Sequence, residues 1–301
     1  MKVGLALGSG GARGLAHVGV IKALQEAGVP VDVIAGSSMG ALVGAAYASN
    51  LSVDGLEEFS REFTWRSMFR LFLPTISREG LIDGKKIKEI LQEKIGCRTF
   101  EELRLPLALE TTDLETGELY TLTQGDLISA VRASISIPLV FTPVRLDGRI
   151  LVDGGLVSPV PVKSARLLGA DFVIGVNVLA QARSWLGADR VQRHFQNGSA
   201  TNSSFLSRFF ANEEKKLASQ VQRDTDLGFM LILTQTIGIS VSRLATFQLK
   251  IEKPDLLIEP DTSAVNIYDF HRGGELIDQG YQLTRQLLEQ NGKLIRRLTS
   301  S

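Results

Sequence analysis

The N-terminal third of the chain alternates short apolar runs with segments of helical periodicity. Apolar residues are continuous over Val3–Leu7, recur at helical spacing over residues 14–27, are continuous again over 31–36, and recur over 39–49. Short continuous runs are typical of strands that are buried on both faces, and the spaced runs are typical of amphipathic helices. Strands and helices that alternate with such short links predict parallel strands covered by helices, which is a layered α/β fold.

Later apolar patterns predict further elements of the same fold. Helices are expected from residue 52, over 84–94, 127–134 and 274–290, and strands over 105–109, 119–122, 150–152, 172–178 and 256–258. The turn at Glu115–Glu118 separates two of these strands, which we therefore expect to form an antiparallel hairpin. We predict a single domain over residues 1–301, with three α/β/α layers around a mixed, mostly parallel sheet.

The composition changes in the region of residues 180–226. Gln, Asn, Ser, Arg and Ala dominate there, which predicts a loop or lid outside the core. A mainly helical segment with interruptions is expected over 211–250. Residues 181–210 hold four arginines, one acidic residue and the aromatic cluster of Phe205–Phe210. This cluster predicts either packing onto the core or peripheral contact with an anionic lipid surface.

Composition and charge narrow the class of protein further. Lys+Arg and Asp+Glu are equal at 33 each, so no overall positive field favours a nucleic-acid partner. Cys97 is the single cysteine, which excludes an internal disulfide and suits a reducing cytosol. Val3–Leu7 is too short for the apolar part of a signal peptide, and the apolar run at 228–233 is too short to span a bilayer. We expect a cytoplasmic protein, with peripheral membrane contact as the alternative location.

A glycine-rich turn, Gly8-Ser-Gly-Gly-Ala-Arg-Gly14, joins the first predicted strand to the first predicted helix. Glycines let the backbone turn sharply and aim its N–H groups at an anion near the positive end of the helix dipole. A dinucleotide fingerprint requires glycine where Arg13 stands, and the ending of a P-loop is absent. A tight strand–helix connection and an oxyanion hole for acyl transfer remain. The charge of Arg13 opposes the helix dipole unless an anion lies nearby or water solvates the side chain.

The segment Gly36-Ser-Ser-Met-Gly40 has the form GxSxG between a predicted strand and a predicted helix. Glycines two residues either side of Ser38 let the turn tighten, so that the serine projects from a strained backbone. This context is typical of a nucleophile elbow, in which Gly36 and Gly40 make the turn. A turn of small residues without catalytic function is the alternative.

A serine nucleophile at position 38 needs a proton acceptor. His17 lies in the first predicted helix and His194 in the polar region, so His271, just before the closing predicted helix, is the candidate to complete a Ser-Asp-His order. Asp153-Gly-Gly155 directly follows a predicted strand and places a carboxylate on an open turn. An ordinary Asp-Gly turn would look the same.

These three motifs, in this order, resemble the patatin-like phospholipase family, particularly its bacterial members. Further segments strengthen the resemblance, which extends well over residues 1–179 and more weakly over 255–290. They are Leu15–Leu24, Val131–Pro138, Phe141–Pro143 and Asp153–Pro161. The loop of the family often opens with three glycines, and Ser9 stands at the first of these positions.

The resemblance implies a catalytic dyad of Ser38 as nucleophile and Asp153 as base. It also implies roles for the neighbouring turns: an oxyanion hole of Gly10, Gly11, Ala12 and Arg13, and a base turn of Gly154 and Gly155. A free aspartic acid is a weak base, with a pKa near ~3.9, and partial burial would raise the pKa toward a useful range.

The activity implied is hydrolysis of acyl esters such as phospholipids, lysophospholipids or glycerides, with transacylation as a variant. No cofactor and no metal are expected, since the sequence shows no metal-ligand spacing. Two other functions remain open. One is a non-catalytic regulatory or partner-binding protein on the same fold, and the other is a Ser-Asp-His hydrolase that uses His271.

Overall fold

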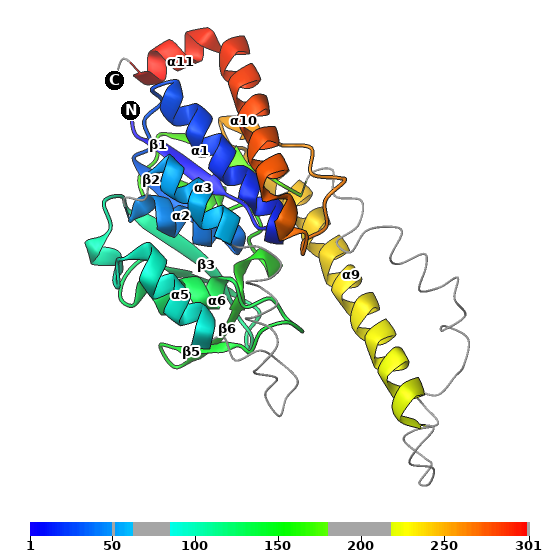
Figure 1. Ribbon diagram of the computed structural model, residues 1–301. Coiled ribbons are helices and arrows are strands. Elements are labelled where there is room, and N and C mark those ends of the chain that lie inside the picture. Colours follow the sequence, from blue (N-terminus) through cyan, green and yellow to red (C-terminus); the bar gives the residue numbers. More distant parts are fainter. Residues whose placement is uncertain (50–51, 63–84, 180–217, 300–301) are drawn as a thin grey trace.

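A sheet of eight strands forms the centre of the molecule (Figure 1). The computed structural model describes residues 1–49, 52–62, 85–179 and 218–299. The strands are β1 (Val3–Leu7), β2 (Val33–Ser37), β3 (Leu107–Asp113), β4 (Leu119–Leu122), β5 (Val144–Leu146), β6 (Arg149–Asp153), β7 (Phe172–Val176) and β8 (Leu256–Ile258). Their order is β5-β6-β3-β2-β1-β7-β8, and β4 also pairs with β3.

The sheet is mixed and mostly parallel, as predicted. The pairs β2–β3, β1–β2, β1–β7 and β7–β8 are parallel, whereas β4 and β6 run antiparallel to β3 and β5 runs antiparallel to β6. The expected hairpin is confirmed as β3–β4, although β3 continues to Asp113, beyond the predicted end of that strand.

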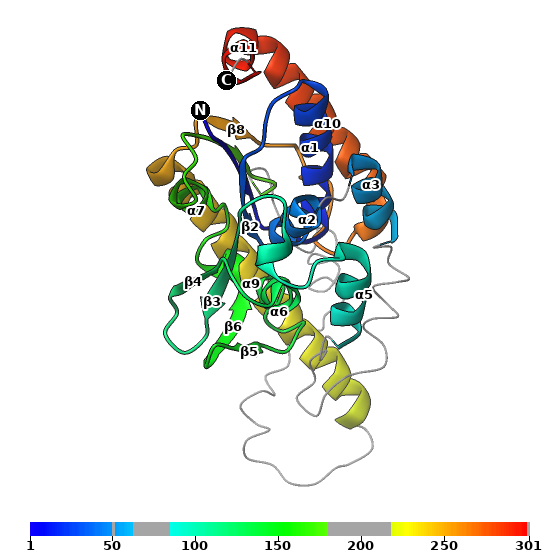
Figure 2. The same cartoon turned by 90° about the vertical axis from the view of Figure 1, so that its left-hand side faces the viewer.

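Helices cover both faces of the sheet. They are η1 (Gly11–Leu15), α1 (Ala16–Glu26), α2 (Met39–Ala48), α3 (Val53–Glu62), α5 (Lys85–Ile95), η2 (Phe100–Glu102), α6 (Leu127–Ser134), η3 (Gly154–Leu156), α7 (Val162–Leu167), α9 (Ala218–Glu252), η5 (Phe270–Arg272), α10 (Gly273–Gln290) and α11 (Gly292–Thr299). Figure 2 shows α7 and α9 on one side of the sheet, and α1, α2 and α10 on the other. The layered α/β architecture is therefore confirmed.

Side chains of different size face the two helical layers. Leu5 and Leu7 of β1 belong to the larger core beneath α1 and α2, whereas Ala6 belongs to the smaller core beneath α7 and α9. Alternate residues of a strand point to opposite faces, so one strand supplies both cores. A Cβ on Gly4 would lie 2.6 Å from the Cβ of Ala170, so glycine allows the close approach of the segment that follows α7.

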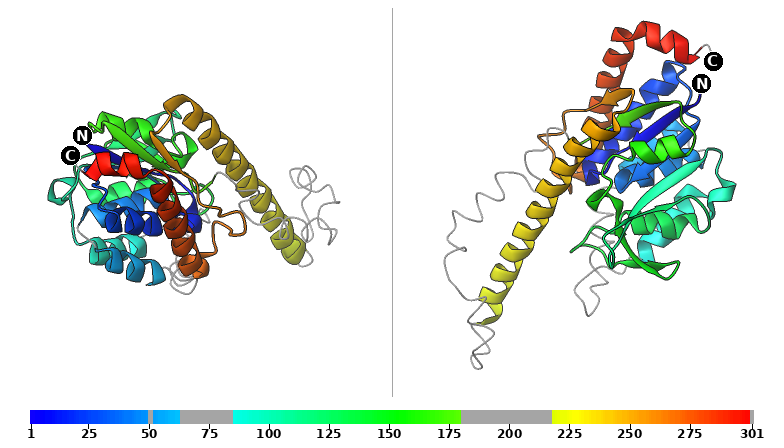
Figure 3. Two further views of the ribbon diagram at one scale, coloured as in Figure 1. Left: turned by 90° about the horizontal axis from the view of Figure 1, so that it is seen from above. Right: turned by 180° about the vertical axis from the view of Figure 1, so that it is seen from behind.

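The C-terminal half differs most from the sequence-based expectation. The interrupted helix expected over 211–250 is one continuous helix, α9, over the described part from residue 218 onward. Residues 218–226, where the expected polar region and the expected helical segment overlap, are helical. Residues 180–217, with the proposed lipid contact at 181–210, lie outside the described residues. Figures 1 and 3 show the N-terminal end of α9 projecting well beyond the sheet. Within the described ranges, no helix combines the length and apolar content needed to cross a bilayer.

One edge of β3 brings two other strands together. Glu110 pairs with Ser37 of β2, and the next residue, Thr111, pairs with Asp153 of β6. β4 pairs with β3 at both positions and must occupy the opposite edge, because a strand has only two edges. β2 runs parallel to β3 and β6 runs antiparallel, so these two strands meet at their C-terminal ends.

Candidate active site

Ser38 stands at a sharp turn between β2 and α2. Its backbone has φ 54° and ψ −121°, a conformation that non-glycine residues rarely adopt. Both flanking glycines are required by close backbone contacts. A Cβ on Gly36 would lie 2.6 Å from the Cα of Ala41, and one on Gly40 would lie 2.1 Å from the carbonyl oxygen of Leu7. The GxSxG spacing therefore lets the turn pack tightly against both α2 and β1.

Asp153 ends β6 and faces the serine directly. The Oγ of Ser38 donates a 2.5 Å hydrogen bond to Oδ2 of Asp153, and the amide of Gly155 donates a 2.7 Å bond to Oδ1. These contacts follow from the sheet, since the residues that end β2 and β6 pair with adjacent residues of β3. Both side chains are nearly inaccessible to solvent, at 2% for Ser38 and 5% for Asp153.

Burial changes the acidity of this carboxyl group. It raises the pKa of Asp153 from 3.8 to about 7, and the hydrogen bonds from Ser38 and Gly155 oppose the rise. Desolvation destabilises the charged form, whereas hydrogen bonds donated to a carboxylate stabilise it. Asp153 consequently titrates in the pH range in which a general base is effective.

The base turn passes close to its neighbours. A Cβ on Gly154 would lie 2.2 Å from the carbonyl oxygen of Glu110, and one on Gly155 would lie 2.5 Å from Oγ of Ser9. At both positions a side chain would collide with neighbouring atoms, so both predicted glycines are required. Ser9, which stands at the first position of the glycine loop, comes next to the base turn.

The glycine loop is anchored at both of its ends. The amides of Gly8 and Ser9 bond to the carbonyls of Val176 and Pro159, at 3.0 and 2.8 Å. The amide of Ala12 bonds to the carbonyl of Ile267 at 2.8 Å, and that of Arg13 to the carbonyl of Gly10 at 3.2 Å. Two of the four residues expected in the oxyanion hole therefore have amides that are already engaged.

The amides of Gly10 and Gly11 differ from their neighbours. Within the residues that the structure describes, neither donates a backbone hydrogen bond. Gly11 lines the same pocket as Ser38 and Asp153. Its φ is 56°, and a Cβ at this position would lie 2.7 Å from the carbonyl oxygen of Ile267. Both the backbone conformation and the lack of space therefore favour glycine here.

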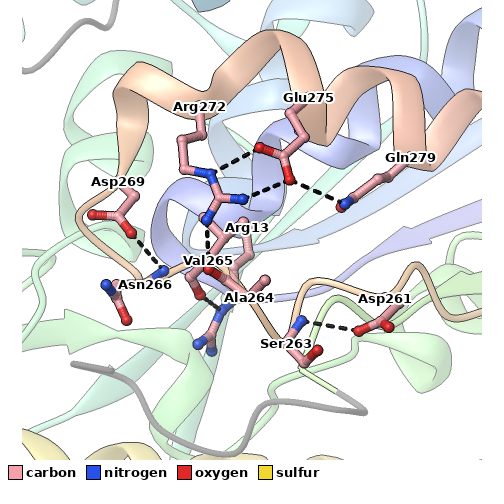
Figure 4. A network of polar contacts seen from close by, with 10 residues as sticks. All are labelled: Arg13, Asp261, Ser263, Ala264, Val265, Asn266, Asp269, Arg272, Glu275 and Gln279. Atoms are coloured by element: carbon pink, nitrogen blue, oxygen red, sulfur yellow. Dashed lines mark hydrogen bonds and ion pairs between the residues drawn. The ribbon is translucent and has the colours of Figure 1, made fainter. Parts of the chain in front are cut away.

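The Arg13 side chain is not solvated and is not among the residues that line the pocket. It is fully buried, and its Nε donates a 2.7 Å hydrogen bond to the carbonyl of Val265 in the segment before η5 (Figure 4). Burial lowers the pKa of Arg13 to about 10, and the charge of Asp269 partly offsets this effect. Arg13 remains a cation at neutral pH and fastens the glycine loop to the C-terminal part of the chain.

Among the described residues, no histidine forms a hydrogen bond with Ser38 or Asp153. His17 is completely buried and donates from Nε2 to the carbonyl of Gly8 at 2.7 Å, and burial lowers its pKa to about 4. It is therefore neutral and supports the glycine loop. His271 is exposed to solvent in η5, and His194 lies outside the described residues. The carboxylate of Asp153 occupies the position next to Ser38 that a triad histidine would need.

The pocket has walls that the motifs did not predict. Besides the serine, the aspartate and the glycine loops, it is lined by Ile137, Pro138, Leu156, Ile237, Val241 and Ile267. Ile237 and Val241 belong to α9, about 200 residues after the nucleophile in the chain. All six additional side chains are apolar, so the structure combines a Ser–Asp contact with an apolar wall. Apolar residues without a motif give no sequence signal that separates a pocket wall from ordinary core.

Comparisons with known proteins identify the family of the chain. The family described as Patatin-like phospholipase matches residues 5–166. An uncharacterized NTE family protein of Mycobacterium tuberculosis is 34% identical over 96% of this chain and 91% of its own length. Lysophospholipase nte1 of Aspergillus fumigatus is 36% identical over 58% of this chain, and mouse Patatin-like phospholipase domain-containing protein 6 is 35% identical over 60%. These matches span only 12% and 14% of the two longer proteins.

The chain thus has a layered α/β fold in which Ser38 stands at a sharp strand–helix turn and bonds to a buried carboxyl group. The chain belongs to the patatin-like phospholipase family, and it is an ester hydrolase.

Proposed function

We propose that this protein hydrolyses the acyl ester bonds of lipids by means of a Ser38–Asp153 dyad. The observation that carries the proposal is the 2.5 Å hydrogen bond from the serine hydroxyl to a buried carboxyl group whose pKa is raised to about 7. A base at hydrogen-bond distance and with a pKa near the working pH is what a serine nucleophile requires.

In the first half of the reaction, Asp153 takes the Ser38 proton while Oγ attacks the ester carbonyl. The tetrahedral oxyanion collapses, the alcohol leaves with the proton from Asp153, and an acyl-Ser38 ester remains. In the second half, Asp153 takes a proton from water, and the hydroxide attacks the acyl-serine. Collapse releases the carboxylic acid and returns the proton to Ser38. Ser38 and Asp153 thus end each turnover in their starting protonation states.

In both tetrahedral intermediates, the amides of Gly10 and Gly11 donate hydrogen bonds to the oxyanion. These N–H groups donate to no backbone carbonyl within the described residues, and Gly11 lines the pocket. Preorganised donors of this kind stabilise the charge that develops in acyl transfer. The amides of Ala12 and Arg13, which were also expected in the hole, are used by Ile267 and Gly10 instead.

Lipid esters are the proposed substrates for two reasons. The additional pocket residues are all apolar, which suits an acyl chain. Relatives with 35–36% identity over their matched segments carry the names lysophospholipase and phospholipase. Phospholipids, lysophospholipids and glycerides share the acyl ester and remain candidates.

Two other functions fit the structure less well. A Ser-Asp-His mechanism needs a histidine against Ser38, whereas Asp153 holds that position and His271 is exposed. A purely regulatory protein would have no need for the strained serine, the buried carboxyl group and the apolar pocket together.

The first experiment is intact-mass labelling with a fluorophosphonate. The native protein should gain a single adduct and Ser38→Ala none, because only an activated serine attacks phosphorus at a useful rate. Ser49→Ala, which removes a partly buried serine hydroxyl that bonds Ala46 at the end of α2, serves as the matched control and should label like the native protein. If the native protein gains no adduct, the dyad is incorrect and the regulatory function becomes the better proposal.

Peripheral membrane contact through residues 181–210 is a separate part of this proposal. Its support is the local excess of arginine and the aromatic cluster in the sequence. Co-sedimentation with vesicles that contain an anionic phospholipid should exceed that with neutral vesicles. Equal recovery in the supernatant with both kinds of vesicle would exclude an electrostatic contact.

A further inference from the structure

The C-terminal end of α6 contacts the backbones of both proposed catalytic residues. The amide of Ser38 donates a 3.0 Å hydrogen bond to Oγ of Ser134, the last residue of α6. Two residues later, the carbonyl of Ser136 accepts a 3.1 Å hydrogen bond from the amide of Asp153. One short segment therefore touches the nucleophile and the base, which are 115 residues apart in the chain.

The Ser134 hydroxyl also connects the elbow to the sheet. It donates a 2.7 Å hydrogen bond to the carbonyl of Glu110, the β3 residue that pairs with the residue before the nucleophile. Ser134 is completely buried and is not among the residues that line the pocket. Its hydroxyl therefore accepts a hydrogen bond from the amide of Ser38, just after β2, and donates one to the carbonyl of Glu110 in β3. It does not reach the substrate pocket.

The backbone of Ser38 needs such support. A non-glycine residue at φ 54° and ψ −121° is strained and persists only where its surroundings hold it in place. The buried amide of this residue would also lose a hydrogen-bond partner if the Ser134 hydroxyl were absent, which is costly. The hydroxyl thus favours the one backbone conformation that points Oγ at Asp153.

The segment after α6 is itself fixed by a buried cation. Nη1 of Arg132 bonds to Oγ of Ser136 at 2.5 Å, and Nη2 bonds to the carbonyl of Thr142 at 3.2 Å. Arg132 also lies over the ring of Phe141, 5.1 Å from its centroid. These contacts hold the turn that presents Ser134 to the elbow and the Ser136 carbonyl to the base.

We infer that Ser134 is a positioning residue, whose hydroxyl holds the strained Ser38 backbone so that the serine oxygen points at Asp153. This inference rests on the proposed dyad. It predicts that loss of the hydroxyl misplaces the nucleophile and weakens its hydrogen bond to Asp153, without altering substrate binding.

The test compares Ser134→Ala with Ser164→Ala. Ser164 is also buried and also donates to Glu110, but to its side chain and away from the elbow, so it controls for the loss of a buried hydroxyl. For Ser134→Ala, the fluorophosphonate labelling rate and kcat on a short-chain p-nitrophenyl ester should fall by about 10- to 100-fold, because small misplacements of reacting groups have effects of this size. KM should stay unchanged, and the midpoint of the pH–rate profile should not fall, because loss of the hydrogen bond from Ser38 raises the pKa of Asp153. Ser164→Ala should keep the native rates.

Native labelling separates the two proposals. If the native protein is unlabelled, the dyad fails; if it is labelled and Ser134→Ala reacts at the native rate, the positioning role alone is excluded. An equal loss of rate in Ser164→Ala would also overturn it, since any buried serine would then have the same effect. If Ser134→Ala has no cooperative thermal transition, Ser134→Cys replaces it, because a thiol is of similar size and only a weak acceptor. A native labelling rate in Ser134→Cys would then exclude the positioning role.

Discussion

In the proposed dyad, direct contact between Ser38 and Asp153 makes the surroundings of one carboxyl group the main determinant of reactivity. In a Ser-His-Asp triad the imidazole already titrates near neutrality, whereas an exposed aspartic acid does not. Here burial supplies the missing basicity by raising the pKa of Asp153 to about 7. The same burial has a cost in stability, because the ionised form is poorly solvated inside the protein.

The pH dependence of the reaction should report this carboxyl group. The base is active only when ionised, so kcat/KM should fall tenfold for each pH unit below about 7 and reach a plateau above it. Initial rates on a soluble ester between pH 5 and 9 measure the midpoint. A midpoint near 4 would mean that Asp153 is not the base or is not desolvated.

Asp153→Asn should remove activity and raise stability at alkaline pH. The pKa of Asp153 is higher in the folded than in the unfolded chain, so the native protein loses stability as the pH rises from about 4 to about 7. The interval of about three pH units corresponds to at most about 4 kcal/mol. The melting temperature of Asp153→Asn should therefore exceed that of the native protein at pH 8, and the difference should shrink at pH 5. A constant difference across that range would contradict the raised pKa.

At this scale, sequence reasoning located the residues that carry motifs. Gly36, Gly40, Ser38 and Asp153 lie on turns whose small residues and neighbouring strands leave a recognisable pattern. The role of Arg13 was not foreseen, because its partners lie more than 250 residues away. The contacts of the α6 end and the α9 side chains that line the pocket were likewise missed, since serine and isoleucine are common in ordinary cores.

At the scale of elements, glycine decides how closely β1 approaches α2. Gly40 lies in the first turn of α2, where alanine has the better helix propensity, yet a Cβ there would lie 2.1 Å from the Leu7 carbonyl oxygen. Gly40→Ala should destabilise the fold by about 2–3 kcal/mol, as overpacking does, which lowers Tm by roughly 3–5 °C in a chain of this length. Gly274→Ala in the first turn of α10 meets nothing within 4 Å and should leave Tm unchanged or slightly higher. Similar Tm values for the two variants would refute the steric role.

The α9 helix has one face on the pocket and another in solvent. Ile237 lines the pocket, whereas Ile239 on the same helix is 53% exposed. Ile237→Phe should narrow the pocket and reduce kcat/KM for a long-chain ester relative to a short-chain ester by about tenfold. Ile239→Phe adds the same bulk outside the pocket and should keep the native ratio. An unchanged ratio in Ile237→Phe would show that the acyl chain does not pass α9.

Most elements were predicted, whereas several short ones and the continuity of α9 were not. β5, α7 and α11 were missed because segments of three to eight residues give little periodic signal. The pattern of α9 looked interrupted, because apolar and small residues occur on all its faces and no single stripe marks the helix. Its buried positions depend on tertiary contacts: Ala245 belongs to the core cluster of the sheet, and Val241 clusters with Leu179 and Ile267.

At the scale of the molecule, the sheet extends past the part that the family model matches. That match ends at residue 166, whereas β7 and β8, the α9 wall of the pocket and α10 come later. α10 packs on α1 at a close glycine contact, where a Cβ on Gly280 would lie 2.1 Å from the carbonyl oxygen of Ala16. The two ends of the chain therefore share one helical layer.

A fragment of residues 1–166 should not fold. It leaves the β7 edge of β1 without a partner and exposes the faces that α9 and α10 cover. Circular dichroism should show no cooperative thermal transition for the fragment, and fluorophosphonate should not label Ser38. The full chain under the same conditions is the control. A labelled, cooperatively melting fragment would show that the later strands are dispensable.

The meeting of β2 and β6 on one edge of β3 also ties reactivity to the order of assembly. A growing chain that has formed only β1, β2 and α2 contains the serine but has neither the Ser134 hydroxyl that holds its backbone nor the base. Loop closure over more than a hundred residues must precede the contact with Asp153. On the proposed mechanism, the nascent chain therefore cannot hydrolyse esters until residue 153 has left the ribosome and β6 has paired. Trapping by a fluorophosphonate during refolding would time the completion of the sheet.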